Sequence, residues 1–339
     1  MASTSQRGKI DPDGEAPETG AQVREVRTTD IDDQSALLRG WDQSYDQLSS
    51  GAFSGLFTEA RLNAVYLFRE ITSRALRQTG ALGPDAFAIG VPLVLEGAAT
   101  FCGEACGAAR LHLFSGSEEF EFHSPSGLDI LGVVLPSSGL FGALADEEQA
   151  WLEPLLARPG LLRARPAELA ELGTLIRESL EVLTEIDEGA GGRHGPRLVA
   201  MERELRAALP RAVLDATLPD QPAPDLAPLR RARLMRDVRD YAARDEAEEV
   251  PTVEEICQAL GVSRRTLQYC FQEAVGAKPA TYLRAVRMNG ARRSIKTGAT
   301  VTEAATEWGF WHFGRFAREY RLLFGELPSV TQRRVAGEG

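Results

Sequence analysis

The 339-residue sequence contains few cysteines, few histidines and no long apolar run. Its four cysteines are too few and too scattered for a disulfide scaffold. No stretch of about 18 apolar residues is present and the first residues are polar, so we expect neither a membrane span nor a signal peptide. These absences predict a cytoplasmic protein without a membrane partner.

Patterns that bind metals or carry out catalysis are also missing. Cys102 and Cys106 form a Cys-x-x-x-Cys pair, but the two further ligands of a structural zinc site are absent. His112 and His123 could face one another on successive strands, yet without a third ligand we interpret them as solvent-facing or paired within the domain. No Gly-x-Ser-x-Gly elbow, phosphate-binding loop or zinc-protease motif occurs. The sequence therefore predicts no enzyme, no cofactor and no metal site.

A helix-turn-helix pattern occurs twice near the C-terminus. In each copy a glycine comes five positions after the first apolar anchor, and an apolar residue follows it directly. Glycine adopts positive φ readily, which allows the chain to reverse between two helices. Such a module places its second helix in the major groove of DNA. The anchors are Ile256, Cys257, Leu260, Gly261, Val262, Leu267 and Phe271 in the first copy, and Ala304, Ala305, Trp308, Gly309, Phe310, Phe316 and Tyr320 in the second.

The outward face of each second helix carries side chains suited to DNA. Arginine can donate two hydrogen bonds to guanine, glutamine can pair with adenine, and a serine N-cap leaves backbone amides free for a phosphate. In the second copy we expect Phe313 or Phe316 to be turned inward. A helical hairpin with solvated charges is the alternative, which two matched copies disfavour. The predicted outward residues are Ser263, Arg264, Arg265, Gln268, His312, Gly314, Arg315 and Arg318.

The stretch from Leu229 to about Arg334 resembles the DNA-binding domain of the AraC/XylS family. The resemblance lies in Leu-Gly-Val-Ser-Arg-Arg-Thr-Leu-Gln, in Trp-Gly-Phe-Trp-His-Phe-Gly-Arg-Phe and in the ending Tyr-Arg-Leu-Leu-Phe-Gly-Glu-Leu-Pro-Ser. It implies that a helix over about residues 280–295 joins the two units, and it adds Tyr269 and His312 to the DNA-binding residues. It also implies a ligand-responsive activator that acts beside RNA polymerase.

The front half predicts a β-rich domain followed by helices. Short alternating runs separated by Gly, Pro, Ser and Asn are typical of a small sandwich or barrel, and the family resemblance implies a cupin-like sensor. A Pro-rich stretch then predicts a stiff linker. The strand candidates are 53–61, 64–72, 87–93, 99–102, 110–114, 119–123 and 128–135, and the helix candidates are 146–156, 166–186 and 197–216.

We therefore expect a multidomain protein whose C-terminal domain is all-α. The net charge is +5 from Leu229 onward and −16 before it, so the basic end is the expected DNA-facing end. The segments are a disordered tail (1–30), a β-rich effector domain (31–136), a helical dimerisation segment (137–216), a Pro-rich linker (217–228) and an AraC-type DNA-binding domain of two helix-turn-helix units (229–335).

Short motifs in the front half, including residues 40–48 and 51–55, are similar to those of ethanolamine-utilisation operon regulators. This similarity implies ethanolamine with a cobalamin as inducers. An ammonium ligand needs a carboxylate, so Glu59, Glu70 and Glu119 are the candidate effector-binding residues. The alternative is that these carboxylates form ion pairs on the domain surface with Arg61, Arg69 and Arg74.

The sequence thus predicts a sequence-specific DNA-binding transcription regulator. Its expected partners are double-stranded DNA, a small-molecule inducer, RNA polymerase and a second copy of the chain. Two other classes stay open: an effector-independent nucleoid-type DNA-binding protein, and a small-molecule-binding protein whose DNA-binding helices are vestigial. The intact outward arginines and glutamine count against the last class.

Overall fold

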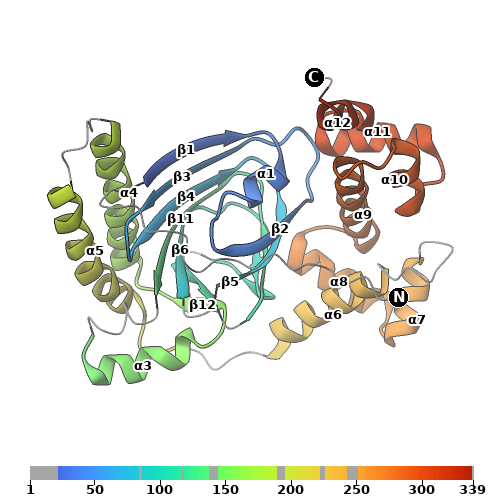
Figure 1. Ribbon diagram of the computed structural model, residues 1–339. Helices are drawn as coiled ribbons and strands as arrows, with labels where there is room; N and C mark the ends of the chain where they lie inside the picture. The colour runs from blue at the N-terminus through green and yellow to red at the C-terminus, as the bar shows by residue number, and fades with distance from the viewer. Residues whose placement is uncertain are drawn as a thin grey trace, which may run out of the picture.

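The computed structural model describes residues 22–83, 86–107, 109–116, 118–136, 144–188, 195–221, 226–242 and 251–337. The front half is β-rich and the C-terminal part is helical, as predicted, and the two parts lie side by side (Figure 1). Within these ranges no helix is both long and apolar enough to cross a membrane.

Two antiparallel sheets form the front domain. The larger has the strand order β1-β3-β4-β11-β6-β9-β12 and the smaller the order β2-β5-β10-β7-β8. Each of the seven predicted runs contains a strand, whereas β1, β2, β5, β8 and β12 were not predicted. The strands are β1 Gln22–Thr28, β2 Trp41–Gln47, β3 Gly55–Arg61, β4 Tyr66–Thr72, β5 Leu76–Leu82, β6 Ala86–Val94, β7 Thr100–Phe101, β8 Glu104–Ala105, β9 Arg110–Ser115, β10 Phe120–Ser124, β11 Leu128–Pro136 and β12 Gly160–Arg163.

The prediction of a disordered tail over residues 1–30 is wrong for its last part. Residues 1–21 lie outside the described residues, but β1 pairs with β3 along its whole length, and helix α1 (Ile31–Ser35) follows at once. An edge strand has one side open to solvent, which allows charged side chains such as Arg24 and Glu25 within it. These charges obscure the alternation that would have indicated a strand.

Both faces of the larger sheet are covered. Successive side chains of a strand point to opposite faces, so Leu67 of β4 packs toward the helices while Phe68 points between the sheets. Helices α3 (Asp146–Leu156), α4 (Pro166–Glu188) and α5 (Gly195–Ala216) lie on the outer side (Figure 1). They match the predicted helices closely, and their apolar sides are buried within the chain.

An aromatic cluster fills part of the space between the sheets, and His112 lies within it. Its ring centroid is 5.1 Å from that of Phe101 and 5.0 Å from that of Phe122. Neither ring nitrogen has a hydrogen-bond partner among the described residues, and burial lowers the pKa of His112 to about 3. The prediction that His112 faces solvent or is paired is therefore wrong, because its inward position on β9 places the ring in an apolar cluster that includes Phe101 and Phe122.

The predicted linker, residues 217–228, is also shorter than expected. Leu218 N donates to Arg163 O over 2.9 Å and the Gln221 side chain bonds both backbone groups of Arg163, so the start of this segment is tied to the front domain. Helix α6 begins at Leu226, inside the predicted linker. The proline in its first turn is tolerated, since the N–H groups of a first turn have no partner within the helix. Residues 222–225 lie outside the described residues.

Seven helices form the described C-terminal part. A long central helix, α9, supplies side chains to two separate cores: Tyr282 and Leu283 to the first, and Met288 and Ile295 to the second. The two cores are therefore joined through one rigid element. The helices are α6 Leu226–Ala242, α7 Val253–Leu260, α8 Arg264–Val275, α9 Pro279–Lys296, α10 Val301–Glu307, α11 Phe313–Phe324 and α12 Pro328–Val335.

Close packing at Gly290 predicts a large effect of one added methyl group. A Cβ placed there would lie 2.3 Å from the Trp308 ring, whose indole donates to Ser294 Oγ over 3.0 Å. We expect Gly290→Ala to lower the free energy of unfolding by about 1 to 3 kcal/mol through overpacking, despite alanine's higher helix propensity. Urea denaturation followed by circular dichroism measures this. Gly314→Ala is the control for stability, since a Cβ there meets nothing within 4 Å; equal losses in both variants would contradict the prediction.

Candidate nucleic-acid interface

The first helix-turn-helix unit consists of α7 and α8. Thr252 and Glu255 form a capping box at the start of α7, and Gly261 ends that helix with φ 63°. Ser263 caps α8 by accepting a hydrogen bond of 3.0 Å from Thr266 N. The predicted glycine turn and serine cap are thus both present.

The outward face of α8 carries the side chains that the sequence assigned to DNA. Leu267, Cys270, Phe271 and Ala274 are buried, as predicted. Around the rest of the helix the exposed side chains include Arg264, Arg265, Gln268 and Tyr269, with Ser263 exposed at its start. These five residues share one accessible surface. Their contact with DNA stays a prediction.

The second unit consists of α10 and α11, joined by a turn in which Gly309 has φ 74°. Phe316 is turned inward and Phe313 is exposed, which decides between the two residues left open by the sequence. The predicted outward residues His312, Gly314, Arg315 and Arg318 are exposed at the start of α11 and along its first turns. Arg315 Nε donates to Glu319 Oε1 over 2.8 Å, so its guanidinium is held on the outer side of the helix.

Helix α9 sets the distance between the two units. It runs from Pro279 to Lys296, within a residue of the predicted bounds, and Pro279 occupies its first turn. An 18-residue helix is about 27 Å long. With the widths of the flanking units, this length suits two recognition helices about 34 Å apart, one turn of DNA.

The C-terminal helices are packed against the front domain, which the sequence did not predict. His123, on β10, lies 3.3 Å from the hydroxyl of Tyr282 on α9, and its other ring nitrogen lies 3.3 Å from Thr100 Oγ1. Burial lowers the pKa of His123 to about 4, so the ring is neutral at pH 7. Next to it Arg239 of α6 forms an ion pair of 2.8 Å with Glu121. The prediction that His123 pairs within its own domain is confirmed, since Thr100 and Glu121 are its partners there. The contact with Tyr282, which joins the two domains, was not predicted.

Asn289 makes a second contact between the domains. Its side chain accepts from Gln47 N and donates to Gln47 O, both over 2.9 Å, and so satisfies one residue of the β2 backbone. The Gln47 side chain in turn donates to Leu323 O of α11 over 2.6 Å. Arg293 lies on the same side of α9 and forms an ion pair of 2.8 Å with Asp46. One face of α9 is therefore fixed to the edge strand β2.

The third contact is a buried group of charges. Arg292 is 4% exposed and forms ion pairs with Asp30 at 2.7 Å and Asp32 at 3.3 Å. Lys296 lies 2.9 Å from each of the same two carboxylates. Burial acts to raise the pKa of Asp30, but hydrogen bonds from Arg292 and Lys296 outweigh it and hold that pKa well below its usual range.

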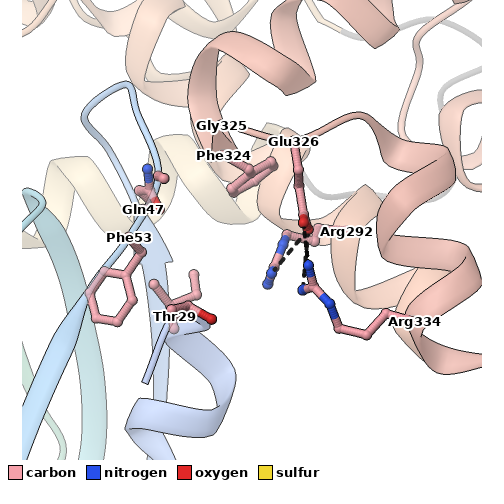
Figure 2. Close-up of a pocket in the computed structure, with 10 residues that line it drawn as sticks. Thr29, Gln47, Phe53, Arg292, Phe324, Gly325, Glu326 and Arg334 are labelled. Carbon is pink, nitrogen blue, oxygen red and sulfur yellow. Dashed lines mark hydrogen bonds and ion pairs between the residues drawn. The ribbon is translucent and has the colours of Figure 1, made fainter. Parts of the chain in front are cut away.

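A cavity of about 160 Å³ lies beside this charged group, between β1, β2 and α1 on one side and α9, α11 and α12 on the other. Figure 2 shows Glu326 linked to both Arg292 and Arg334, with Thr29, Gln47 and Phe53 across the opening. Its polar lining is close to charge balance, because carboxylates already neutralise the arginines.

The three candidate effector carboxylates do not form one site. Glu59 is buried and bound to Arg24 at 2.7 Å and to the Tyr66 hydroxyl at 2.6 Å. Glu70 is buried on the adjacent strand β4 and is bonded to Gln34 and Tyr45, and Glu119 is exposed. The arginines predicted as alternative partners of these carboxylates contact other groups, so that alternative is wrong. Arg61 lies over the Tyr66 ring, Arg69 pairs with Asp129, and Arg74 donates to Ala52 O.

Metal-ligating residues are spread through the molecule. Across the described ranges, no group of three or more His, Cys, Asp or Glu side chains is placed to hold a metal ion. Cys102 and Cys106 are free thiols at the β7–β8 hairpin, and burial raises their pKa values to about 11 and about 12. Both therefore remain protonated at neutral pH, which does not suit a metal ligand or a reactive thiol.

Comparison with known proteins finds one domain model and several relatives that each match part of the chain. Residues 256–334 match the model of a helix-turn-helix domain. The chain is 36% identical over 142 residues to the "Probable thc operon regulatory protein" of Rhodococcus erythropolis, covering 41% of this chain and 38% of that protein. It is 36% identical over 84 residues to the "XylDLEGF operon transcriptional activator 2" of Pseudomonas putida, covering 24% of this chain and 54% of that one. The chain thus spans about half or less of the length of these curated relatives.

Among solved structures, one similar chain is a "probable AraC family transcriptional regulator" from Rhodopseudomonas palustris. It is 34% identical with a TM-score of 0.27, and the match covers 30% of this chain and 97% of that chain. The two curated relatives are named as an operon regulatory protein and an operon transcriptional activator. None of the names concerns ethanolamine.

Proposed function

We propose that this chain, whose residues 256–334 are a helix-turn-helix domain of the kind found in AraC-family regulators, is a sequence-specific DNA-binding transcription regulator that activates its target genes. The similarity to operon regulators supports this function over a nucleoid-type or a vestigial DNA-binding protein. In this proposal α8 enters one major groove and α11 enters the next.

One observation carries the proposal: two exposed, arginine-bearing helix faces are mounted on the single helix α9. Arg264, Arg265 and Gln268 on α8 and Arg315 and Arg318 on α11 are all exposed. Base contacts from two such faces add their specificity, whereas contacts to phosphates alone would not distinguish sequences.

Arg265→Ala is the variant that tests base contact. Its side chain lies near the middle of the outward face of α8, so we expect a loss of about 1 to 3 kcal/mol at the cognate site and relaxed choice at one or two base pairs. The site is first found by selecting the full chain on a random DNA pool, and affinities are then measured by fluorescence anisotropy at fixed salt. Arg197→Ala is the matched control, an exposed arginine on α5, far from α8 (Figure 1).

Two results would contradict this role of Arg265. Equal losses on selected and random DNA would mean that Arg265 contacts only phosphate. Failure of the wild-type chain to select any sequence would support the nucleoid-type or vestigial alternatives and remove the proposed function.

For the signal, we propose a small polar metabolite, with ethanolamine plus a cobalamin as the specific candidate. The similarity of the front-half motifs to ethanolamine-utilisation regulators supports this candidate. Glu59 and Glu70 are already bonded within the domain, so a ligand would have to displace those bonds or bind elsewhere. Calorimetric titration of the full chain with ethanolamine, alone and with cobalamin, tests this candidate. If no heat of binding is measured at millimolar ligand, ethanolamine is not the inducer.

We also propose that the chain acts as a homodimer beside RNA polymerase, which rests on the family resemblance. Most apolar side chains of α4 and α5 are buried against the sheet or against each other, and exposed positions such as Val182 and Val199 are available to a second copy. Sedimentation velocity of the full chain tests the dimer, and transcription in a purified system with RNA polymerase tests activation.

A further inference from the structure

Two exposed aromatic side chains stand at the start of α11, the second proposed recognition helix. Trp311 is 58% exposed and Phe313 is 45% exposed. Within the described part of the chain, neither ring stacks on another ring or lies under a cation. The neighbouring Phe310 is different, because it is buried, 5.1 Å from Phe316, with Arg284 above its ring. The two exposed rings therefore contribute little to the core.

Their position coincides with the surface proposed to meet DNA. Trp311 and Phe313 flank His312, the N-cap of α11, and Arg315 and Gly314 follow in the first turn. Space around Gly314 is open, since an added Cβ would meet nothing within 4 Å. A helix start with open space beside it can approach the floor of a groove closely. The aromatic rings would then face base edges, which do not carry the charge of the phosphates.

We infer that Phe313 and Trp311 are specificity-determining residues that contact thymine methyl groups in the major groove facing α11. This inference rests on the proposed function and deepens it. The 5-methyl group of thymine is the one apolar feature of the major-groove edge, and apolar side chains are its usual protein contacts. Arginine and histidine at the same helix start present polar tips to the base edges, so the two rings supply the apolar surface that a thymine methyl group favours.

The position of the two rings, on a surface that also carries exposed arginines, indicates DNA as their binding partner. The rings adjoin Arg315 and Arg318, both exposed, and these cations attract a polyanion. The other exposed apolar residue of α11, Leu322, is 61% exposed near the C-terminal end, two turns away from the helix start. Leu322 therefore serves as a matched control for an exposed apolar side chain on the same helix.

The test uses DNA in which single thymines are replaced by deoxyuridine, which removes only the methyl group. The full chain is first used to select its binding sequence from a random pool. Each thymine of the selected site is then replaced in turn, and affinity is measured by fluorescence anisotropy. For the wild-type chain we expect about a fourfold loss at one or two thymines of the half-site facing α11, the value for about 0.8 kcal/mol per buried methyl group.

The variants decide whether Phe313 and Trp311 are responsible. At one of these positions Phe313→Ala should have the same affinity for the thymine and the deoxyuridine site, and Trp311→Ala should behave in this way at a neighbouring position. Once the ring is removed, removal of the methyl group that it contacted causes no further loss of affinity. Phe313→Leu keeps an apolar side chain and should keep most of the methyl preference. Leu322→Ala should keep the wild-type profile. Circular dichroism and affinity for random DNA show whether each variant is folded.

Several outcomes would overturn the inference. The first is that the half-site facing α11 contains no thymine. The second is that the wild-type chain loses no affinity at any deoxyuridine replacement. The third is that neither alanine variant changes the pattern of affinity losses. In these cases Arg265→Ala can still relax specificity, so the proposed function stands while the inference fails, and the rings then serve a protein contact. If the wild-type chain selects no sequence, both fail.

Discussion

We expect Asp30→Ala to lower the free energy of unfolding of the full chain by about 3 to 5 kcal/mol, the usual cost of removing one partner from a buried ion pair. The substitution leaves the guanidinium of Arg292 inside the contact between the domains, with its nearest carboxylate gone. Lys296 loses one of its two close carboxylates at the same time. Urea denaturation of the full chain at pH 7 measures the loss.

Two further variants separate the contributions of Asp30. Its side chain also caps α1 by accepting from Asp32 N over 2.9 Å. Asp30→Asn keeps a good N-cap but removes the charge. If the ion pair dominates, this variant should show most of the decrease in unfolding free energy that Asp30→Ala shows. Asp33→Ala is the matched control, since that side chain is 70% exposed and 3.8 Å from Lys296. A loss in Asp30→Ala no larger than in Asp33→Ala would show that the buried ion pair does not stabilise the contact.

The second large effect concerns Glu70 and the pH. Burial raises the pKa of Glu70 to about 7, although hydrogen bonds from Gln34 and Tyr45 act to lower it. The unfolded chain releases this proton near pH 4.5, whereas the folded chain holds it until about pH 7. Between these values the folded state binds more protons, so its stability falls as the pH rises, by about 1.4 kcal/mol per pH unit. The total is about 3 kcal/mol.

Glu70→Gln removes this titration and keeps the shape of the side chain. The difference in unfolding free energy between variant and wild type should therefore grow by about 3 kcal/mol in favour of the variant from pH 4.5 to pH 8. Tyr45→Phe removes a hydrogen-bond donor that lowers the pKa of Glu70. The stability of this variant should therefore continue to fall at a higher pH than that of the wild type. Urea denaturation at a series of pH values gives both curves. A difference between Glu70→Gln and wild type that does not change with pH would show that Glu70 is already ionised in the folded chain.

The helix-turn-helix units could be predicted from the sequence because their signals are local. Apolar anchors three and four residues apart define the buried side of a helix. Gly261 marks the end of α7 through positive φ, and Ser263 marks the start of α8 through capping. The same kind of signal gave α3 and α4 nearly to the residue, and the family resemblance gave α9. The strands with regular alternation were found as well. Those missed were the charged edge strand β1 and strands such as β5, where Gly80 and polar residues interrupt the pattern.

The sequence by itself thus determined two helix-turn-helix units with arginine-bearing outer faces, behind a β-rich domain with a helical cover. Only the tertiary structure decided that Asp30 and Arg292, 262 residues apart, would meet in a buried ion pair, that His123 would bridge the domains, and that Phe313 rather than Phe316 would be exposed. The physical reason is that helix periodicity and caps act over four residues or fewer. Contacts between domains depend on which charged side chains two folded surfaces bring together, and this leaves no periodic trace in the chain.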